Sequence, residues 1–301
     1  MEGLKRMSSF ASAASVPAEA MPAPRPRVWF ISNLTRGFGL ELVRQVLARG
    51  DQVVVTAPNI DKVMEAFPDG DAGLLALSLD LADAGQVQYA VDQAVAHFGR
   101  IDLLINNASM GVLGAIEEVS DAEVLQAVEG NLLGVVRMTR AVLPQMRRQR
   151  SGQIVNMSTF ATTGEGPGWG VYAATKSAID GLSEVLAEEV GPLGIGVTLL
   201  EPVPFRSDFM IDSLIVGQRV IDDYYDTSGR TRRRQGVPLG NPAWYPLAGV
   251  SSVIEALTAE KPPLRLVLGH KGYYKALKKL ESLRQEHMAW HDVSLAMDHV
   301  L

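Results

Sequence analysis

Short apolar runs that alternate with longer helical patterns are the feature that most constrains the fold of this 301-residue chain. From residue 28 onward the alternation continues without an internal repeat or a linker. The runs are continuously apolar, which is typical of parallel strands covered on both faces. We expect strands at residues 28–32, 52–56, 74–78, 101–105, 153–157, 196–200 and 264–267, and helices at 40–48, 84–97, 122–146 and 172–190. This series predicts an α/β fold, a doubly wound parallel sheet of about seven strands with helices on both faces.

Two segments do not follow the alternation. Residues 1–27 are rich in Ala, Ser and Pro, and we expect a disordered tail there; Glu2, Glu19 and the prolines fit the alternative, a transit peptide, poorly. Residues 28–301 then form a single domain. Residues 204–240 lack strand periodicity, and we expect an insertion over the sheet edge where the strands end and ligands bind. For the arginine run at 230–234 we favour a solvated face.

Composition excludes several kinds of site. The chain has no cysteine, which rules out a disulfide scaffold, a thiolate nucleophile and a Cys-ligated metal centre. His287 and His291 stand four apart, but Met288 occupies the position where a zinc protease needs Glu, so we expect no metal site. The net charge of −6 argues weakly against a nucleic-acid partner, and no apolar run approaches the roughly 18 residues of a membrane span.

The turn after the first expected strand carries two glycines, Gly37 and Gly39, at the start of a helix. Glycines there let the backbone approach a pyrophosphate, which then meets the positive end of the helix; a purely structural turn could use the same glycines. After the second strand, where an NAD-binding chain would carry a carboxylate, Thr56, Ala57 and Pro58 stand instead. Together with Arg36 in the glycine turn, this favours NADP over NAD.

Tyr172 and Lys176 stand four apart at the start of an expected helix, so their side chains share one face. A free phenol has a pKa near 10, and a nearby ammonium lowers it toward the range useful for acid–base catalysis. Thr159 ends the preceding strand and offers a hydroxyl to a substrate oxygen.

From residue 28 onward the chain resembles the short-chain dehydrogenase/reductase family, whose fold is Rossmann-like. The resemblance rests on the glycine turn, Asp80, Asn106-Asn107-Ala108, Asn131, Thr159 and Tyr-x-x-x-Lys, in this order. It implies four catalytic residues. Asn131 helps to hold the water of a proton relay, Thr159 orients the substrate oxygen and Tyr172 is the general acid and base. Lys176 binds the nicotinamide ribose and tunes the tyrosine. The resemblance also implies cofactor contacts from Ser32, Asn33, Thr35, Arg36, Gly37, Phe38, Gly39, Asp80, Leu81, Asn107, Ala108, Tyr172, Lys176, Pro202 and Ser207.

The chain departs from the family pattern at three glycines, which are replaced by Asn33, Ser109 and Val203. The resemblance predicts an NADP(H)-dependent oxidoreductase that interconverts a carbonyl and an alcohol on an apolar small molecule. The departures leave open an alternative, an isomerase, dehydratase or cyclase with altered or lost cofactor binding; a cofactor-sensing or interaction protein fits the intact Asn131, Tyr172 and Lys176 less well. We expect a cytoplasmic homodimer or homotetramer, paired through helices 122–146 and 172–190, with no nucleic-acid or membrane partner.

Overall fold

The computed structural model describes residues 25–34, 37–68, 70–159, 166–202, 213–234 and 247–296. Its centre is a seven-stranded sheet in the order β3-β2-β1-β4-β6-β7-β9, in which all neighbouring strands are parallel. The strands are β1 (Val28–Ser32), β2 (Gln52–Ala57), β3 (Leu74–Ser78), β4 (Leu103–Asn106), β6 (Gly152–Met157), β7 (Ile195–Pro202) and β9 (Arg265–Leu268). The predicted doubly wound parallel sheet is therefore confirmed.

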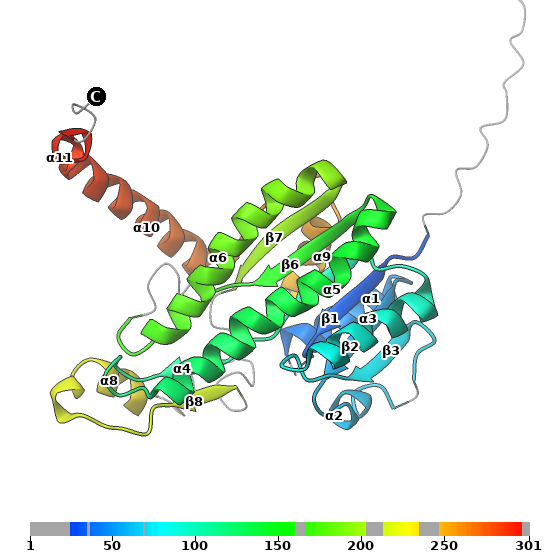
Figure 1. Ribbon diagram of the computed structural model, residues 1–301, viewed down its shortest axis with the longest axis horizontal. Helices are drawn as coiled ribbons and strands as arrows, with labels where there is room; N and C mark the ends of the chain where they lie inside the picture. The colour runs from blue at the N-terminus through cyan, green and yellow to red at the C-terminus, as the bar shows by residue number, and fades with distance from the viewer. Residues whose placement is uncertain are drawn as a thin grey trace, which may run out of the picture.

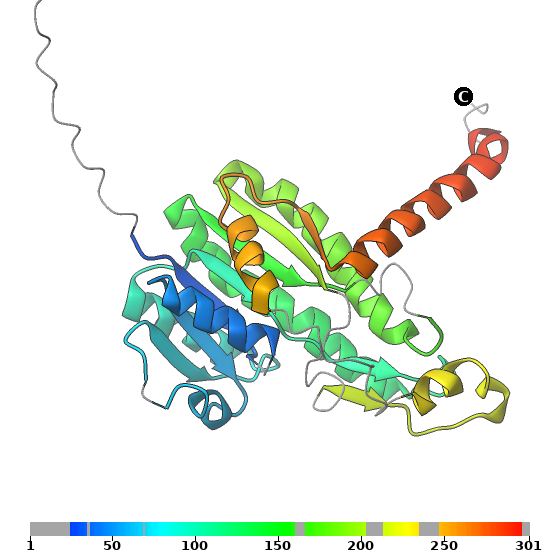
Figure 2. The same cartoon turned by 180° about the vertical axis from the view of Figure 1, so that it is seen from behind.

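Helices cover both faces of this sheet. On one face, α1 (Phe38–Ala48) and α9 (Leu247–Leu257) bury an apolar cluster that includes Leu42 and Ile254 (Figure 2). On the other, α3 (Ala84–Phe98), α5 (Gly134–Gln149) and α6 (Gly170–Val190) bury a second cluster around Met138 and Leu104 (Figure 1). The short helix α2 (Asp61–Met64) lies between β2 and β3. Because the strands are buried on both sides, their continuous apolar runs follow directly from this layering.

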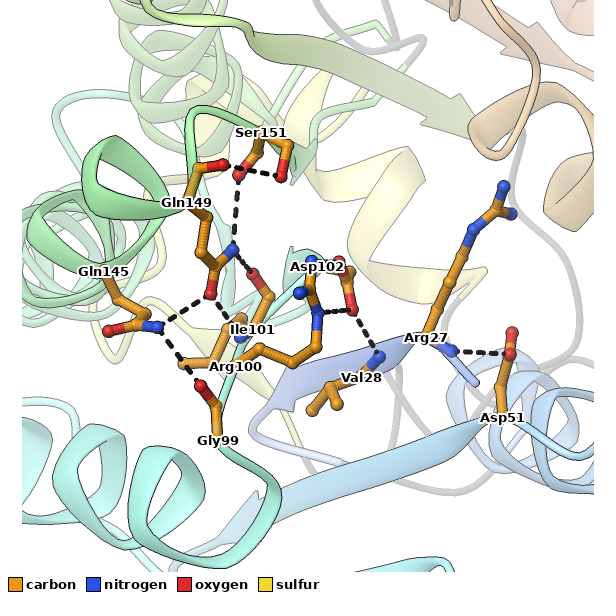
Figure 3. A network of polar contacts seen from close by, with 10 residues as sticks. All are labelled: Arg27, Val28, Asp51, Gly99, Arg100, Ile101, Asp102, Gln145, Gln149 and Ser151. Atoms are coloured by element: carbon orange, nitrogen blue, oxygen red, sulfur yellow. Dashed lines mark hydrogen bonds and ion pairs between the residues drawn. The ribbon is translucent and has the colours of Figure 1, made fainter. Parts of the chain in front are cut away.

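The amino ends of the strands are closed by a polar network (Figure 3). The Asp102 carboxylate accepts the Val28 amide at 2.9 Å and also pairs with Arg100. The Gln149 side chain bonds both backbone groups of Ile101, accepting its amide at 3.0 Å and donating to its carbonyl at 2.7 Å. Ile101 therefore lies outside β4, which begins two residues later than the sequence predicts. The candidate functional residues lie at the opposite edge of the sheet, where the strands have their carboxyl ends.

The helix expected at 122–146 is not uniform. It comprises α4 (Asp121–Val128), a π-helical turn η1 (Glu129–Leu133) and α5. Ser120 and Glu123 form a capping box at the start of α4. The π-turn, a feature that is frequent at functional sites, contains Asn131.

A second, two-stranded sheet lies beyond the carboxyl ends of the main strands. In it β5 (Gly111–Leu113) pairs in parallel with β8 (Leu214–Val216), followed by a 3₁₀ turn η4 (Asp222–Tyr224) and α8 (Ser228–Arg233). Strand β8 corrects the expectation that residues 204–240 hold no strand, since three residues are too few to show a periodicity. The Arg run is not wholly solvated, because Arg232 pairs with the buried Glu118 at 2.9 Å.

The carboxyl-terminal helices project from the body as an arm. After β9, α10 (His270–Ala289) and α11 (His291–Leu295) extend away from the sheet in both views (Figures 1 and 2). Every residue from Leu277 to Ala296 is exposed. Within the described ranges, no helix is long and apolar enough to cross a membrane.

Candidate active site

The residues singled out in the sequence gather at the carboxyl edge of the main sheet. Ser32 ends β1, Asn107 and Ala108 follow β4, Thr159 follows β6 and Pro202 ends β7. This is the edge at which doubly wound sheets bind ligands. Thr35, Arg36 and Ser207 lie outside the described residues.

Two described residues of the turn after β1 have positive φ angles. Asn33 has φ 49° and Gly37 has φ 79°, both in the left-handed region. The Thr56 hydroxyl accepts the Asn33 amide at 3.1 Å, and the Asn107 side-chain amide donates to the Asn33 carbonyl at 3.1 Å. Asn33 therefore adopts the conformation usually supplied by glycine, held by Thr56 of β2 and by Asn107 after β4.

A dinucleotide fits this turn. A Cβ added to Gly39 would lie 2.9 Å from Leu34 Cδ1 and 3.4 Å from the Asn107 side-chain nitrogen, so the start of α1 packs closely against these two side chains. Gly37 caps α1 without a side-chain hydrogen bond, and the positive end of a helix dipole favours an anion. The residues present can thus cradle a pyrophosphate.

Tyr172 lies in the first turn of α6 and is 6 % exposed. Its hydroxyl oxygen lies 3.4 Å from the hydroxyl oxygen of Ser109, in the segment after β4. The ring of Trp169 packs edge-on against it, with centroids 5.8 Å apart. Thr159 is also buried, at 4 % exposure. The phenol is therefore shielded from bulk water. Its hydroxyl neighbour is Ser109, which the sequence marked only as the replacement of a family glycine.

Lys176 is fully buried one helical turn beyond Tyr172. Its ammonium nitrogen donates to the Met157 carbonyl at 2.8 Å and lies 6.0 Å from the centre of the Tyr172 ring. Burial lowers the pKa of Lys176 to about 8, although the nearby Asp180 carboxylate opposes this shift. The Lys176 side chain thus lies between the end of β6 and α6.

Asn131 connects the π-turn to the segment that carries Ser109. Its side-chain oxygen accepts the Met110 amide at 2.7 Å, and its nitrogen donates to the Met110 carbonyl at 2.7 Å. The same nitrogen donates to the Thr175 hydroxyl at 3.0 Å, and Thr175 donates to the Tyr172 carbonyl at 2.8 Å. Asn131 therefore fixes the Ser109–Met110 segment relative to the first turn of α6.

A polar cluster behind Thr159 was not predicted. Ser158 donates to the carboxylate of Asp180, which also pairs with Arg265 at 3.6 Å. Arg265 reaches Glu201 at 2.7 Å. Burial raises the pKa of Glu201, and the bond from Arg265 only partly offsets this. These contacts join the residue after β6 to α6, β7 and β9, and no local sequence pattern indicates them.

Two further residues predicted to contact the cofactor, Asp80 and Leu81, follow β3 at the carboxyl edge of the sheet. Asp80 is exposed after β3; its carboxylate accepts the Ala82 amide at 2.9 Å. Leu81 is half-buried, and its carbonyl accepts Arg137 at 3.2 Å. Among the described residues, no group of three or more His, Asp and Glu side chains could hold a metal ion.

Comparison with known proteins decides the family. Residues 27–214 match the short chain dehydrogenase family. The chain is a short-chain dehydrogenase/reductase. It is 34 % identical to Oxidoreductase BOA17 of Botryotinia fuckeliana, over 90 % of this chain and 98 % of that one. The predicted family is thus confirmed, and the chain belongs to a family of oxidoreductases.

Two further similarities bear on this short-chain dehydrogenase/reductase. It is 32 % identical to the 3-ketodihydrosphingosine reductase of Bacteroides thetaiotaomicron, over 81 % of this chain and 88 % of that protein. The crystal structure of a short-chain dehydrogenase from Streptomyces avermitilis superposes with a TM-score of 0.81 at 34 % identity, covering 90 % of this chain and 98 % of that one. These matches establish the fold and the family, while substrate and cofactor are matters of proposal.

Proposed function

We propose that this enzyme interconverts a carbonyl and an alcohol on an apolar small molecule with NADP(H). The observation that carries the proposal is the buried phenol of Tyr172 at the carboxyl edge, between the Ser109 hydroxyl and the buried ammonium of Lys176. A phenol in this setting is suited to move one proton to or from a substrate oxygen. The 3-ketodihydrosphingosine reductase relative supports a ketone on an apolar chain as the substrate class.

Each residue has a role in the reduction. Nicotinamide, when bound, supplies the hydride that the carbonyl carbon accepts. Tyr172 gives its hydroxyl proton to the carbonyl oxygen, so the substrate becomes an alcohol and the tyrosine a phenolate. Lys176 stabilises that phenolate by its positive charge, and Thr159 orients the substrate oxygen by a hydrogen bond. Asn131 holds the Ser109–Met110 segment against the site.

The preference for NADP(H) rests on the end of β2. Ala57, Pro58 and Asn59 follow one another there, and none carries a carboxylate that would repel a 2′-phosphate. Arg36 in the glycine turn offers the complementary charge. Pro58 and Asn59 are exposed, so the position is open to a ligand.

A second candidate is a non-redox isomerase, dehydratase or cyclase. The side chain of Asn33, at positive φ in the phosphate turn, favours it, because this turn usually carries a glycine without side-chain bulk. In that case Tyr172 still acts as the acid and base, and nucleotide binding is weak or lost.

The enzyme's setting is proposed on similar grounds. We expect a cytoplasmic homodimer or homotetramer with a small-molecule substrate and no nucleic-acid partner. A shallow apolar depression between α5 and α6, lined by Leu143, Pro144 and Leu182 among others, supports pairing of these helices between copies.

Nucleotide titration tests the proposal. NADPH is added to the purified protein while nicotinamide fluorescence is followed, and NADH is titrated in parallel. We expect NADPH to bind at least ten-fold more tightly, and Pro58→Asp to reverse that order because its carboxylate repels the 2′-phosphate. Pro58→Ala is the matched control and keeps the preference for NADPH. Failure of both nucleotides to bind would overturn the redox assignment and favour the non-redox candidate.

A further inference from the structure

The arm formed by α10 presents an apolar stripe to water. Tyr273 is 52 % exposed, Leu277 45 %, Leu280 63 % and Leu283 37 %. Gly272 is the residue of α10 that is buried. A lone helix of this length is marginally stable in water, and its stability in proteins comes from packing of its apolar face. The exposed apolar side chains of α10 thus indicate that this helix packs against a partner.

The apolar stripe has the spacing of a coiled coil. The positions that alternate by three and four residues are Tyr273, Ala276, Leu280, Leu283 and His287, and Leu277 lies beside them. This 3.5-residue period is the one that keeps a seam facing a second helix. Three lysines, Lys271, Lys275 and Lys278, lie on the opposite face by the same periodicity.

An antiparallel pair of these helices is self-complementary in one register. Leu280 then faces Leu283 of the second copy, the small Ala276 faces the larger His287, and Tyr273 faces Trp290 just past the helix end. Beside this seam, Lys279 of each copy meets Glu286 of the other, so both flanking pairs have opposite charges. On the other side of the seam Arg284 comes nearest to Leu277 of the second copy, and its charge is balanced by Glu281 of the same helix at 3.0 Å.

We propose that α10 pairs in antiparallel orientation with α10 of a second copy of this chain, forming a two-fold symmetric interface. Each copy offers the same surface, so two copies close the interface and leave no free seam. This contact is separate from pairing through α5 and α6, since the arm extends away from those helices (Figure 1).

A membrane surface fits the arm less well. His287 belongs to the stripe and Arg284 lies beside it, so both would be placed against lipid. Helix α10 carries five Lys or Arg and two Glu, a net charge of +3 in a chain of net −6. The rest of the chain therefore carries −9 and is repelled by an anionic lipid surface.

The absence of cysteine makes a clean cross-linking test possible in the full-length protein. Leu280→Cys and Leu283→Cys are purified separately, one copy carrying a tag, and are oxidised alone and as a mixture. We expect a disulfide dimer on a non-reducing gel chiefly in the mixture, because residue 280 faces residue 283 of the other copy. Gln285→Cys, on the far face of the helix, is the matched control and stays monomeric on the gel.

Charge reversal gives a second, independent readout. Lys279→Glu places like charges beside the seam and is expected to reduce cross-linking several-fold in the Leu280→Cys and Leu283→Cys mixture. The double change Lys279→Glu with Glu286→Lys restores it.

Three results would overturn the proposal. Cross-linking of Leu280→Cys alone as strongly as of the mixture would show a parallel pair. No cross-link in a protein that light scattering shows to be oligomeric would leave α5 and α6 as the interface. Sedimentation of the wild type with vesicles of phosphatidylcholine and phosphatidylserine, lost in Leu280→Asp and without any cross-link, would assign the arm to membranes.

Discussion

The hydroxyl oxygens of Ser109 and Tyr172 lie 3.4 Å apart, although the two residues are 63 positions apart in the chain. A serine hydroxyl can donate to a phenolate and so stabilise the form in which Tyr172 accepts a proton. Ser109→Ala removes this donor. A hydrogen bond of about 1 kcal/mol corresponds to a shift of about 0.7 pH unit. For Ser109→Ala we expect the pKa on the acidic side of the pH profile of kcat/KM, measured for alcohol oxidation, to rise by about 0.7 unit.

Ser109→Thr is the control for this prediction, because it keeps the hydroxyl; its profile should stay close to that of the wild type. The measurement is initial rate against pH, from pH 6 to 10. An identical profile for Ser109→Ala and the wild type would show that the contact does not tune the tyrosine.

The buried Lys176 makes stability depend on pH. Burial lowers its pKa from the usual 10.5 to about 8, so between these values the unfolded chain binds more protons than the folded protein. The free energy of unfolding therefore rises with pH in this window. From pH 8 to 9.5 the wild type should gain about 2 kcal/mol relative to Lys176→Met, which has no such proton.

Urea denaturation of both proteins at the two pH values measures this difference, and comparing the wild type with the variant cancels groups common to both. A difference that does not change with pH would contradict the buried, easily deprotonated ammonium.

Glu118 anchors the segment that carries β8 and α8. Its carboxylate accepts the Ile221 amide at 3.0 Å, the Ser228 hydroxyl at 3.1 Å and Arg232 at 2.9 Å, and it is 2 % exposed. Breaking a buried, hydrogen-bonded ion pair costs about 3–5 kcal/mol. We expect Glu118→Gln to lower the free energy of unfolding by about 3 kcal/mol at pH 7, or to open this segment to protease.

The neighbouring Glu117→Gln serves as the control, because its ion pair with Arg219 is exposed and should contribute less than about 1 kcal/mol. Burial pushes the pKa of Glu118 upward, but the bonds it accepts hold that pKa below the usual 4.5. Its contribution is therefore present above pH 4.5 and is lost as the pH falls further. Equal stability of both variants at pH 7 would contradict the anchoring role.

The sequence predicts those parts of the fold and site that depend on near neighbours. The continuous apolar runs predict the parallel sheet, because strands covered on both faces need them. Tyr172 and Lys176 are brought together by one helical turn, so their spacing alone places them on one face.

The contacts between distant segments could not be predicted in this way. Ser109 reaches Tyr172 only because β4 and α6 meet at the sheet edge, and Glu118 reaches Arg232 across 114 positions. The π-turn at Asn131 is five residues long, too short for a periodic pattern to distinguish it from the α-helices on either side. Such features depend on the tertiary fold, and one sequence holds no local signal for them.

The central claim is that Tyr172 supplies the proton in carbonyl reduction. Tyr172→Phe keeps the ring that packs against Trp169 and removes only the hydroxyl. The direct measurement is the rate of NADPH oxidation with a ketone on an apolar chain, together with NADPH affinity by fluorescence. We expect the variant to bind NADPH within about two-fold of the wild type while turnover falls at least 10²-fold, the scale of general acid catalysis. Turnover within ten-fold of the wild type would contradict the assignment.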